Sequence, residues 1–507
     1  MMSDQPRERW GSRAGFLLAA IGSAVGLGNI WRFPAEAYRN GGGAFMLPYL
    51  IALVTAGLPL LIMEYTIGRR YRGSAPASYL RLGRPAQFIG WWQVAICFVI
   101  ATYYALILAW ALRYVGFSVG QSWGDDAEGF LFGTFLQVGD TPGELGGYVG
   151  GVFWPLLAIW VTVLITLALG IRHGIETAAK IFIPLLIVFF VVLVVRALTL
   201  DGADLGLDAL FTPDWDALTD GDVWVAAYGQ IFFSLSVGFG IMITYASYLG
   251  RRSDLSGSAL VAGFANSSFE ILAGIGVFAT LGFLAASSGG AVFETEGGLG
   301  LAFVAFPTII SEMPWGGFFG VLFFLSLVVA GWTSLISIMQ VIVAAVQDRL
   351  RVNRVVSVAM VGTLVALVSL LLYPTNGGLY LLDAADRFIN RYGIALASLI
   401  SVIVVAWLLR KLPVLQRDAD ATSAVKLGRW WKLCLGIITP IVLGLMLIDS
   451  FAQEIDENYG DYPSSFLAWA GWGVAGGALL IGIVLSLIPW RRGAEVPPDA
   501  DDEKRSA

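Results

Sequence analysis

Gly22-Ser-Ala-Val-Gly-Leu-Gly-Asn-Ile-Trp-Arg-Phe-Pro34 lies in the middle of the first long hydrophobic segment of the chain and decides the fold. A glycine costs about 1 kcal/mol relative to alanine in a helix interior, and an unpaired backbone amide costs several kcal/mol in hydrocarbon. Irregular backbone at membrane depth is tolerated only where it is buried in protein or lines a polar cavity. The stretch therefore predicts an interrupted helix at an ion or solute site. The alternative is a helix-packing face formed by Gly22 and Gly26.

The composition predicts an all-α integral membrane protein. Apolar residues make up 57% of the 507 residues and charged residues 13%, with a mean hydropathy of +0.75. A membrane span needs about 20 apolar residues, and about twelve segments meet that criterion: 14–37, 43–68, 88–117, 149–171, 176–198, 223–249, 257–286, 315–347, 353–373, 379–409, 430–452 and 464–490. The first segment has no cleavage site and is expected to be a span. Cys97 and Cys434 fall inside spans, which favours buried thiols over a disulfide.

Charges alternate from loop to loop. Arginines and lysines gather before the first span, between spans two and three, and in every second loop after that. The intervening loops are acidic: residues 197–223 hold seven aspartates and no Lys or Arg. The positive-inside rule then places both termini in the cytoplasm of a multi-pass protein, and the short outer loops favour a prokaryotic inner membrane. The net charge of −6 follows from the acidic loops, so no nucleic-acid partner is indicated.

A second interrupted segment lies in the sixth span, where Gln230-Ile-Phe-Phe-Ser-Leu-Ser-Val-Gly-Phe-Gly240 repeats the break of small residues. Because five spans separate the starts of spans one and six, the two helices cross the membrane in opposite senses. Broken helices at matching places in inverted halves indicate the midplane binding site of a secondary transporter. The expected organisation is an N-terminal segment, a first repeat, a second repeat, two peripheral helices and a disordered cytoplasmic tail, at 1–13, 14–198, 223–409, 430–490 and 491–507.

Gly26-Leu-Gly-Asn-Ile-Trp-Arg-Phe-Pro34, followed by Asn40-Gly-Gly-Gly-Ala-Phe45, resembles the signature of the neurotransmitter:sodium symporters. The likeness is greatest to the bacterial amino-acid transporters of the leucine-transporter type, and it runs from Arg7 to about the twelfth span. The resemblance implies a five-plus-five inverted-repeat core, with helices 1 and 6 unwound, and two peripheral helices. It also implies two sodium sites.

The implied sodium ligands are neutral oxygens, as a hard monovalent cation stripped of water requires. The first site resembles one built from a substrate carboxylate oxygen together with Ala24, Asn29, Ser234 and Asn266. The second resembles one built from Gly22, Val25, Ala330, Thr333 and Ser334. The alternative for the two hydroxyls of the second site is a hydrogen bond to their own helix. For the two asparagines of the first site, the alternative is a hydrogen bond between helices.

The resemblance implies an amino-acid substrate with a free carboxylate. Family members that carry amines lacking a carboxylate have an aspartate at the position of Gly26, so here the substrate itself would complete the first sodium site. Tyr104 would donate to the carboxylate, and Phe233 would be the lid of an apolar pocket. Core packing is the alternative for the apolar members of the implied substrate site, which comprises Ser23, Ala24, Gly26, Gly28, Ile100, Tyr104, Phe233, Ser234, Ser236, Phe239, Ser334 and Ile338. Ser23 departs from the asparagine of the leucine-transporter type.

Carboxylates inside spans carry a functional hypothesis because burying an unpaired charge is expensive. Glu270 lies one turn after Asn266, at a position where chloride-dependent family members have a serine. Its carboxylate predicts that no chloride is required, and its protonation during the empty return step would produce proton counter-transport. The alternative is a neutral, structural glutamic acid. Glu64 resembles the residue that accepts hydrogen bonds from freed amides of the unwound sixth helix.

Charged pairs are expected to gate both sides of the site. Arg32 and Asp386 would form the outer pair, through water, and Arg7 and Asp348 the inner pair, assisted by Tyr248. An exposed ion pair contributes about 0–1 kcal/mol, which suits a gate that opens in each cycle. Gly174 and Pro184 in span five resemble a family motif at which unwinding would admit water to the second sodium site; the alternative is that they mark the end of the span.

The sequence therefore predicts a symporter that carries an amino acid with a hydrophobic side chain inward across the lipid bilayer, together with sodium. No nucleophile and base set, metal-ligand cluster or phosphate-binding loop accompanies the single histidine, His173, so an enzyme is not expected. Two alternatives remain at this point: a transporter-like receptor that binds sodium and amino acid without carrying them, and a proton-driven carrier of the same fold. The oligomeric state is open.

Overall fold

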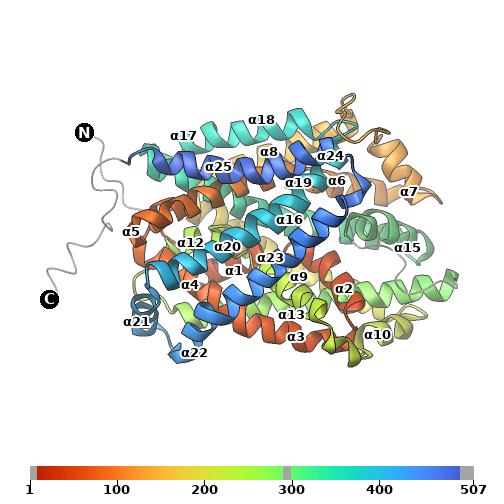
Figure 1. The fold of residues 1–507 in the computed structure, drawn as a ribbon. Coiled ribbons are helices and arrows are strands. Elements are labelled where there is room, and N and C mark those ends of the chain that lie inside the picture. The colour runs from red at the N-terminus through yellow and green to blue at the C-terminus, as the bar shows by residue number, and fades with distance from the viewer. Residues whose placement is uncertain (1–7, 289–297, 491–507) are drawn as a thin grey trace.

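The computed structural model describes residues 8–288 and 298–490, and these are almost entirely helical (Figure 1). Within these residues, β structure is limited to two isolated bridges, Gly42 with Pro213 and Tyr148 with Thr375. The helices of the first half are α1 (Arg13–Ala24), α2 (Leu27–Arg39), α3 (Met46–Ala52), α4 (Leu58–Tyr71), α5 (Ala75–Leu82), α6 (Gln87–Gly120), α7 (Ala127–Gly129), α8 (Gly150–Ala168), α9 (Thr177–Leu198) and α10 (Ala203–Phe211).

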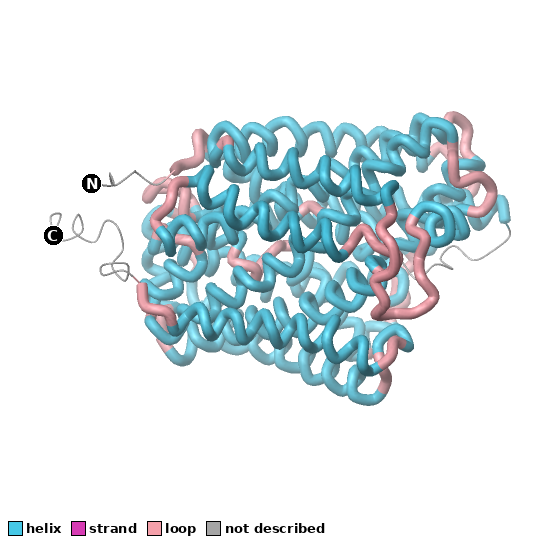
Figure 2. Tube along the Cα trace, turned by 90° about the horizontal axis from the view of Figure 1, so that it is seen from above, coloured by secondary structure: helices cyan, strands magenta, loops and turns pink. Residues whose placement is uncertain are grey.

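The second half holds α11 (Gly221–Ser234), α12 (Ile241–Ala246), α13 (Leu255–Ser288), α14 (Gly298–Gly300), α15 (Phe306–Glu312), α16 (Gly316–Leu350), α17 (Arg354–Ser357), α18 (Thr363–Leu372), α19 (Gly378–Phe388), α20 (Ala395–Ile403), α21 (Leu412–Thr422), α22 (Gly428–Leu433), α23 (Thr439–Asp456), α24 (Ser464–Phe466) and α25 (Gly473–Leu487). Short π-helical or 3₁₀-helical segments join several of these helices into continuous rods. The rods lie side by side, with the breaks of the central helices between them (Figures 1 and 2).

Ten rods in the described residues are long and apolar enough to cross a membrane, each matching a predicted span. The two remaining predicted spans are the interrupted ones. α1 and α2 form a pair bent by 53°, and α11 and α12 are separated by residues 235–240. The prediction of an all-α membrane protein is confirmed, with the first and sixth hydrophobic segments interrupted; ten of the twelve predicted spans in the described residues pass singly, and the first passes as a bent pair.

The two breaks have local causes. At the first, Val25 ends α1 in an extended conformation, and Gly26 precedes α2 with φ −128° and ψ −166°. At the second, Ser236 (φ +52°), Gly238 (φ +83°) and Gly240 (φ +77°) turn the chain through left-handed conformations that a helix cannot contain. Each break leaves backbone amides and carbonyls without helical partners, in the middle of the bundle.

Exposure separates the core helices from the lipid-facing ones. α6 packs along α16 and is buried on nearly all sides, as expected for a helix that is apolar around its whole circumference. On the outside, α8, α9 and α25 present large apolar side chains, including Trp154, Ile165, Val195 and Leu487. These faces are suited to contact with lipid.

The short helix α10 ties two distant segments together. Gly206 packs so closely on α13 that a Cβ at this position would lie 1.7 Å from the carbonyl oxygen of Phe278. At its other end, the Gly43 amide donates to the Thr212 carbonyl at 3.2 Å, and the Asp214 amide donates to the Gly41 carbonyl at 3.1 Å. Backbone contacts thus join α13 to the loop between α2 and α3.

Candidate functional site

The two helix breaks meet at the centre of the bundle, against α16. The Ser236 hydroxyl donates to the Ser23 carbonyl at 2.8 Å, which links the break in the sixth span to the end of α1. The Ser337 hydroxyl donates to the Ser23 hydroxyl at 2.8 Å, which links the same position to α16. The contact from Ser337 was not predicted from the sequence, although a serine one turn after Ser334 could have indicated it.

Four of the five predicted ligands of the second sodium site come together where α1 ends against α16. The Thr333 hydroxyl lies 2.9 Å from both the Gly22 and the Ala330 carbonyl oxygens. The Ser334 hydroxyl lies 3.4 Å from Gly22 O and 3.2 Å from Ala330 O. The two hydroxyls contact carbonyl oxygens of their own helix and also of α1. Hydrogen bonding to their own helix alone therefore does not account for their positions. Val25, the fifth ligand, is buried at the end of α1.

The side chains predicted for the first sodium site form one chain of hydrogen bonds. The Asn29 amide donates to Asn266 Oδ1 at 2.9 Å, and the Asn266 amide donates to Ser234 Oγ at 2.9 Å. Asn29 Oδ1 also accepts from the Gly26 amide at 2.9 Å. All three side chains are buried, and Ala24, the other residue predicted for this site, is the last residue of α1. The interhelical hydrogen bond that is the alternative role of the asparagines is therefore present, at a point where neutral oxygens from three helices gather.

Glu270 is fully buried beside this chain. Its carboxylate accepts a hydrogen bond from the Tyr49 hydroxyl and another, at 2.7 Å, from the Gln230 amide. No arginine or lysine of the described chain forms an ion pair with it. Tyr49 and Gln230 were missed from the sequence, because their pairing with Glu270 spans 221 and 40 residues and leaves no local pattern.

Gly26 and Gly28 face the predicted substrate region. A Cβ on Gly26 would lie 3.2 Å from Ser334 Oγ and 3.3 Å from the Tyr104 hydroxyl. A Cβ on Gly28 would lie 2.6 Å from the ring of Phe233, so the ring rests directly on this glycine. The guanidinium of Arg32 covers the same ring, 4.6 Å from its centroid. Ile100, Phe239 and Ile338 are buried in the bundle core, where packing and substrate contact are both compatible with their burial.

Glu64 supports the second break. Its Oε1 accepts from the Gly238 amide at 2.8 Å, as the resemblance implied. Its second carboxylate oxygen is buried without a hydrogen-bond partner. The Cys97 thiol, also predicted to be buried and unpaired, donates to the Phe239 carbonyl at 3.3 Å.

The predicted gate residues are placed as follows. Arg32 lies 3.7 Å from Glu36, and Asp386 Oδ1 accepts from Asn390 at 2.8 Å. Arg32 and Asp386, both among the described residues, do not form a direct ion pair. On the other side, Asp348 accepts from the Ser74 amide at 2.6 Å, and the Tyr248 hydroxyl accepts from Gln340 at 2.8 Å. Arg7 lies outside the described residues.

A tether at the start of the fifth span was not anticipated. Glu176 is buried and accepts from the Gly11 amide at 2.6 Å, the Ser12 hydroxyl at 2.9 Å and Lys180 at 2.6 Å. It thereby joins the segment preceding α1 to α9. Gly174, from the predicted glycine and proline motif, lies in the widened turn Ile171–Glu176 that precedes α9.

The sequence matches the profile of the Sodium:neurotransmitter symporter family over residues 7–131 and 124–492. The chain belongs to this family. It is 40% identical over 485 residues to an uncharacterised sodium-dependent transporter of Methanocaldococcus jannaschii, a match that covers 95% of this chain and 96% of the relative. The human sodium- and chloride-dependent neutral and basic amino acid transporter B(0+) is 28% identical, with 96% of this chain and 85% of the relative covered.

Among solved structures, the chain is similar to MhsT in complex with L-phenylalanine, with a TM-score of 0.74 and 33% identity. The match covers 88% of this chain and all of that one. Together with the family and the interrupted helices, it identifies the protein as a sodium-coupled, multi-pass membrane transporter rather than an enzyme.

Proposed function

We propose that the protein imports an amino acid with a hydrophobic side chain, together with sodium, across a prokaryotic inner membrane with both termini in the cytoplasm. The observation that carries this proposal is the position of Gly26. The two polar atoms nearest to its missing side chain are the hydroxyls of Ser334 and Tyr104. The protein supplies donors there and no carboxylate, so the substrate brings the negative charge.

The substrate carboxylate would sit at the start of α2, where the helix N-terminus favours an anion. One of its oxygens would complete the first sodium site beside Asn29, Asn266 and Ser234. Sodium and amino acid then each supply part of the other's binding site, so each raises the affinity for the other by the same factor. This reciprocity is the proposed basis of coupling.

The second sodium would be held by the oxygens that converge between α1 and α16. Thr333 and Ser334 would contribute hydroxyls and Ala330 a carbonyl from one continuous helix, and Gly22 and Val25 would contribute carbonyls from the end of a broken one. A sodium ion at this junction would fix α1 against α16, and its loss would free α1 to move. Each positive charge that enters is driven by about 2.3 kcal/mol per 100 mV of membrane potential.

The pocket for the substrate side chain would be formed by Ile100, Phe239 and Ile338, with Phe233 as the lid. A mostly apolar lining with few polar groups suits an aliphatic or aromatic side chain. The L-phenylalanine in complex with the similar protein MhsT supports an amino acid of this class.

The proposed role of Glu270 is to supply a fixed negative charge close to the first sodium site, so that no chloride is required. Its two donors, Tyr49 and Gln230, hold the carboxylate beside Ser234. In the return step without sodium and substrate, uptake of a proton by Glu270 would offset the buried charge and produce proton counter-transport.

Alternating access would then exchange the site between the two sides, with the Arg32 and Phe233 stack closing the outer side. On the inner side, Asp348, Tyr248 and Arg7 are the proposed gate. The direct partners of Arg32 and Asp386 in the structure are other residues, so their mutual contact is proposed only through water.

Uptake into proteoliposomes tests this function. A pool of labelled amino acids is supplied with an inward sodium gradient, with potassium substituted for sodium, and with gluconate substituted for chloride. We expect sodium-dependent accumulation of a hydrophobic amino acid that does not need chloride. Sodium-dependent binding without accumulation would instead indicate a receptor, and accumulation driven by a proton gradient alone would indicate a proton-driven carrier.

Thr333→Ala tests the second sodium site, with Ser326→Ala as the matched control. Ser326 is a buried hydroxyl on the same helix that donates only to its own helix, to Phe323 O at 2.6 Å. We expect the first variant to lose sodium-driven uptake and the second to behave like the wild type. Unchanged sodium-driven uptake by Thr333→Ala would contradict the assignment.

A further inference from the structure

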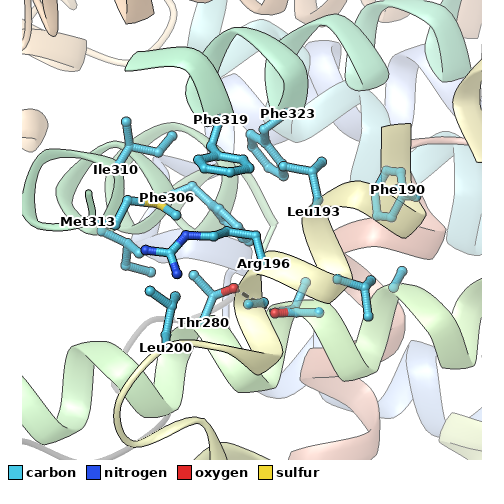
Figure 3. Close-up of a pocket in the computed structure, with 16 residues that line it drawn as sticks. Phe190, Leu193, Arg196, Leu200, Thr280, Phe306, Ile310, Met313, Phe319 and Phe323 are labelled. Atoms are coloured by element: carbon cyan, nitrogen blue, oxygen red, sulfur yellow. Dashed lines mark hydrogen bonds between the residues drawn. The ribbon is translucent and has the colours of Figure 1, made fainter. Parts of the chain in front are cut away.

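An apolar pocket lies at the C-terminal end of α9. It is formed between α9, α13, α15 and α16 and has a volume of about 40 Å³ (Figure 3). Phe190 and Leu193 from α9, Phe306 from α15 and Phe323 from α16 line it, with the Phe306 and Phe323 rings stacked 4.1 Å apart. The lining is almost entirely hydrocarbon, so the pocket suits an alkyl chain.

Arg196 is the exception to this lining. In Figure 3 its side chain crosses the pocket, with Phe319 and Phe323 on one side and Thr280 and Leu200 on the other. The guanidinium lies 5.7 Å from the centroid of the Phe319 ring and donates one hydrogen bond, to Thr199 Oγ1 at 3.0 Å.

No carboxylate of the described chain forms an ion pair with Arg196. The acid nearest in sequence to the lining of α15, Glu312, is hydrogen-bonded to Ser287 at 2.8 Å. A guanidinium has five N–H donors, and only one of them has a partner in the described chain. The group therefore presents unused donors and a positive charge from a partly exposed side chain that lines an apolar pocket.

The surroundings of the pocket belong to the edge of the membrane. On α9, Val188, Val195 and Leu198 are 57%, 56% and 45% exposed, which marks a face suited to lipid. Arg196 stands two residues before the end of this span, at Leu198. Trp315, 82% exposed at the start of α16, occupies the position that tryptophans favour at the boundary between hydrocarbon and headgroups.

We propose that this pocket is a binding site for an anionic phospholipid. The phosphate would accept charge-assisted hydrogen bonds from Arg196, which is the geometry that guanidinium and phosphate groups favour. Part of an acyl chain would lie in the pocket, against the rings of Phe306, Phe319 and Phe323. The pairing explains why a cation is kept in an apolar pocket at the lipid boundary, where an unpaired charge is costly.

Native mass spectrometry of the full-length protein in detergent tests the site. The protein is incubated with equal amounts of phosphatidylglycerol and phosphatidylcholine that carry identical acyl chains. We expect the wild type to retain phosphatidylglycerol about five- to tenfold more tightly than phosphatidylcholine. Arg196→Gln removes this preference, and Arg196→Lys, which keeps the charge, retains part of it.

Arg113→Gln is the matched control, because Arg113 also stacks on a phenylalanine, with its guanidinium 4.7 Å from the Phe117 centroid, but lies outside the pocket. It should keep the wild-type preference. Leu193→Trp, which fills the pocket and leaves Arg196 in place, should weaken phosphatidylglycerol retention by a similar factor. If Arg196→Gln does not fold, Leu193→Trp still tests whether the pocket binds phosphatidylglycerol.

Three results would overturn the proposal. The first is an equal preference for phosphatidylglycerol in the wild type and Arg196→Gln. The second is no effect of Leu193→Trp. The third is full competition by glycerophosphoglycerol, the same headgroup without chains, which would reduce the site to one for a free phosphate diester.

Discussion

Gly26→Ala separates the proposed carboxylate site from a merely structural glycine. The glycine has φ −128° and ψ −166°, which alanine adopts without strain. The new methyl group would lie 3.2 Å from Ser334 Oγ and 3.3 Å from the Tyr104 hydroxyl, so these side chains must yield by only a few tenths of an ångström. The fold should therefore tolerate the change, and alanine should raise the free energy of unfolding by about 0.4–1 kcal/mol.

Whereas the substitution should stabilise the fold, it should weaken substrate binding. The methyl group occupies the space in which the carboxylate is proposed to meet the Tyr104 hydroxyl. Loss of one hydrogen bond to a charged group costs about 1.5–3 kcal/mol, so the apparent affinity for the amino acid should fall about 10- to 150-fold.

The assay is sodium-dependent uptake at a series of substrate concentrations, with thermal unfolding of the same preparation measured in parallel. Gly116→Ala is the control, since a Cβ at Gly116 would have no neighbour within 4 Å. An affinity for Gly26→Ala within twofold of the wild type would refute the reasoning. An equal fall in both variants would show that the effect is not local.

Three glutamates give further predictions. Glu270→Ser should make uptake dependent on chloride, because the two donors that hold the carboxylate remain to bind an anion; uptake in chloride and gluconate media measures this. Glu64→Ala leaves the Gly238 amide unpaired and should lower the free energy of unfolding by about 1–3 kcal/mol, whereas Glu64→Gln, which keeps an acceptor, should not; thermal unfolding compares them. Glu176→Ala should speed hydrogen exchange at the Gly11 amide, which loses its acceptor, and mass spectrometry of deuterated peptides detects the change.

The exposed Glu128 supplies a control for all three. Glu128→Ala should leave chloride dependence, unfolding and exchange unchanged. Equal uptake by Glu270→Ser in both media would contradict the fixed-charge argument. Equal stability of the two Glu64 variants would show that the hydrogen bond to Gly238 contributes little.

The interruptions of the first and sixth spans were predictable because their cause is local. Glycine, asparagine and proline inside an apolar run leave a signature within a dozen residues. The partners of Glu270 and Ser23 were not predictable in this way, since Tyr49 and Ser337 lie 221 and 314 residues from them. Side-chain pairing between helices depends on rotation and depth, which the apolar pattern does not specify.

Ser236 illustrates a second limit. Its left-handed backbone is uncommon for a serine, and the sequence around it offers glycines at 238 and 240 as the more obvious turning points. The hydrogen bond from its side chain to Ser23 O, at 2.8 Å, accompanies this conformation. Such a contact exists only after the two breaks have met.

The attachment of α10 at both ends constrains how the transporter can open. Its contacts to α13 and to the loop between α2 and α3 are made through backbone atoms and glycines, so no change of side-chain rotamer releases them. Segments from the first and second halves of the chain are thus joined into one mechanical unit on this side of the molecule. An opening motion that keeps these contacts must displace this unit as a whole against α6 and α16, and a spin-label distance between α10 and α13 should stay constant throughout the cycle.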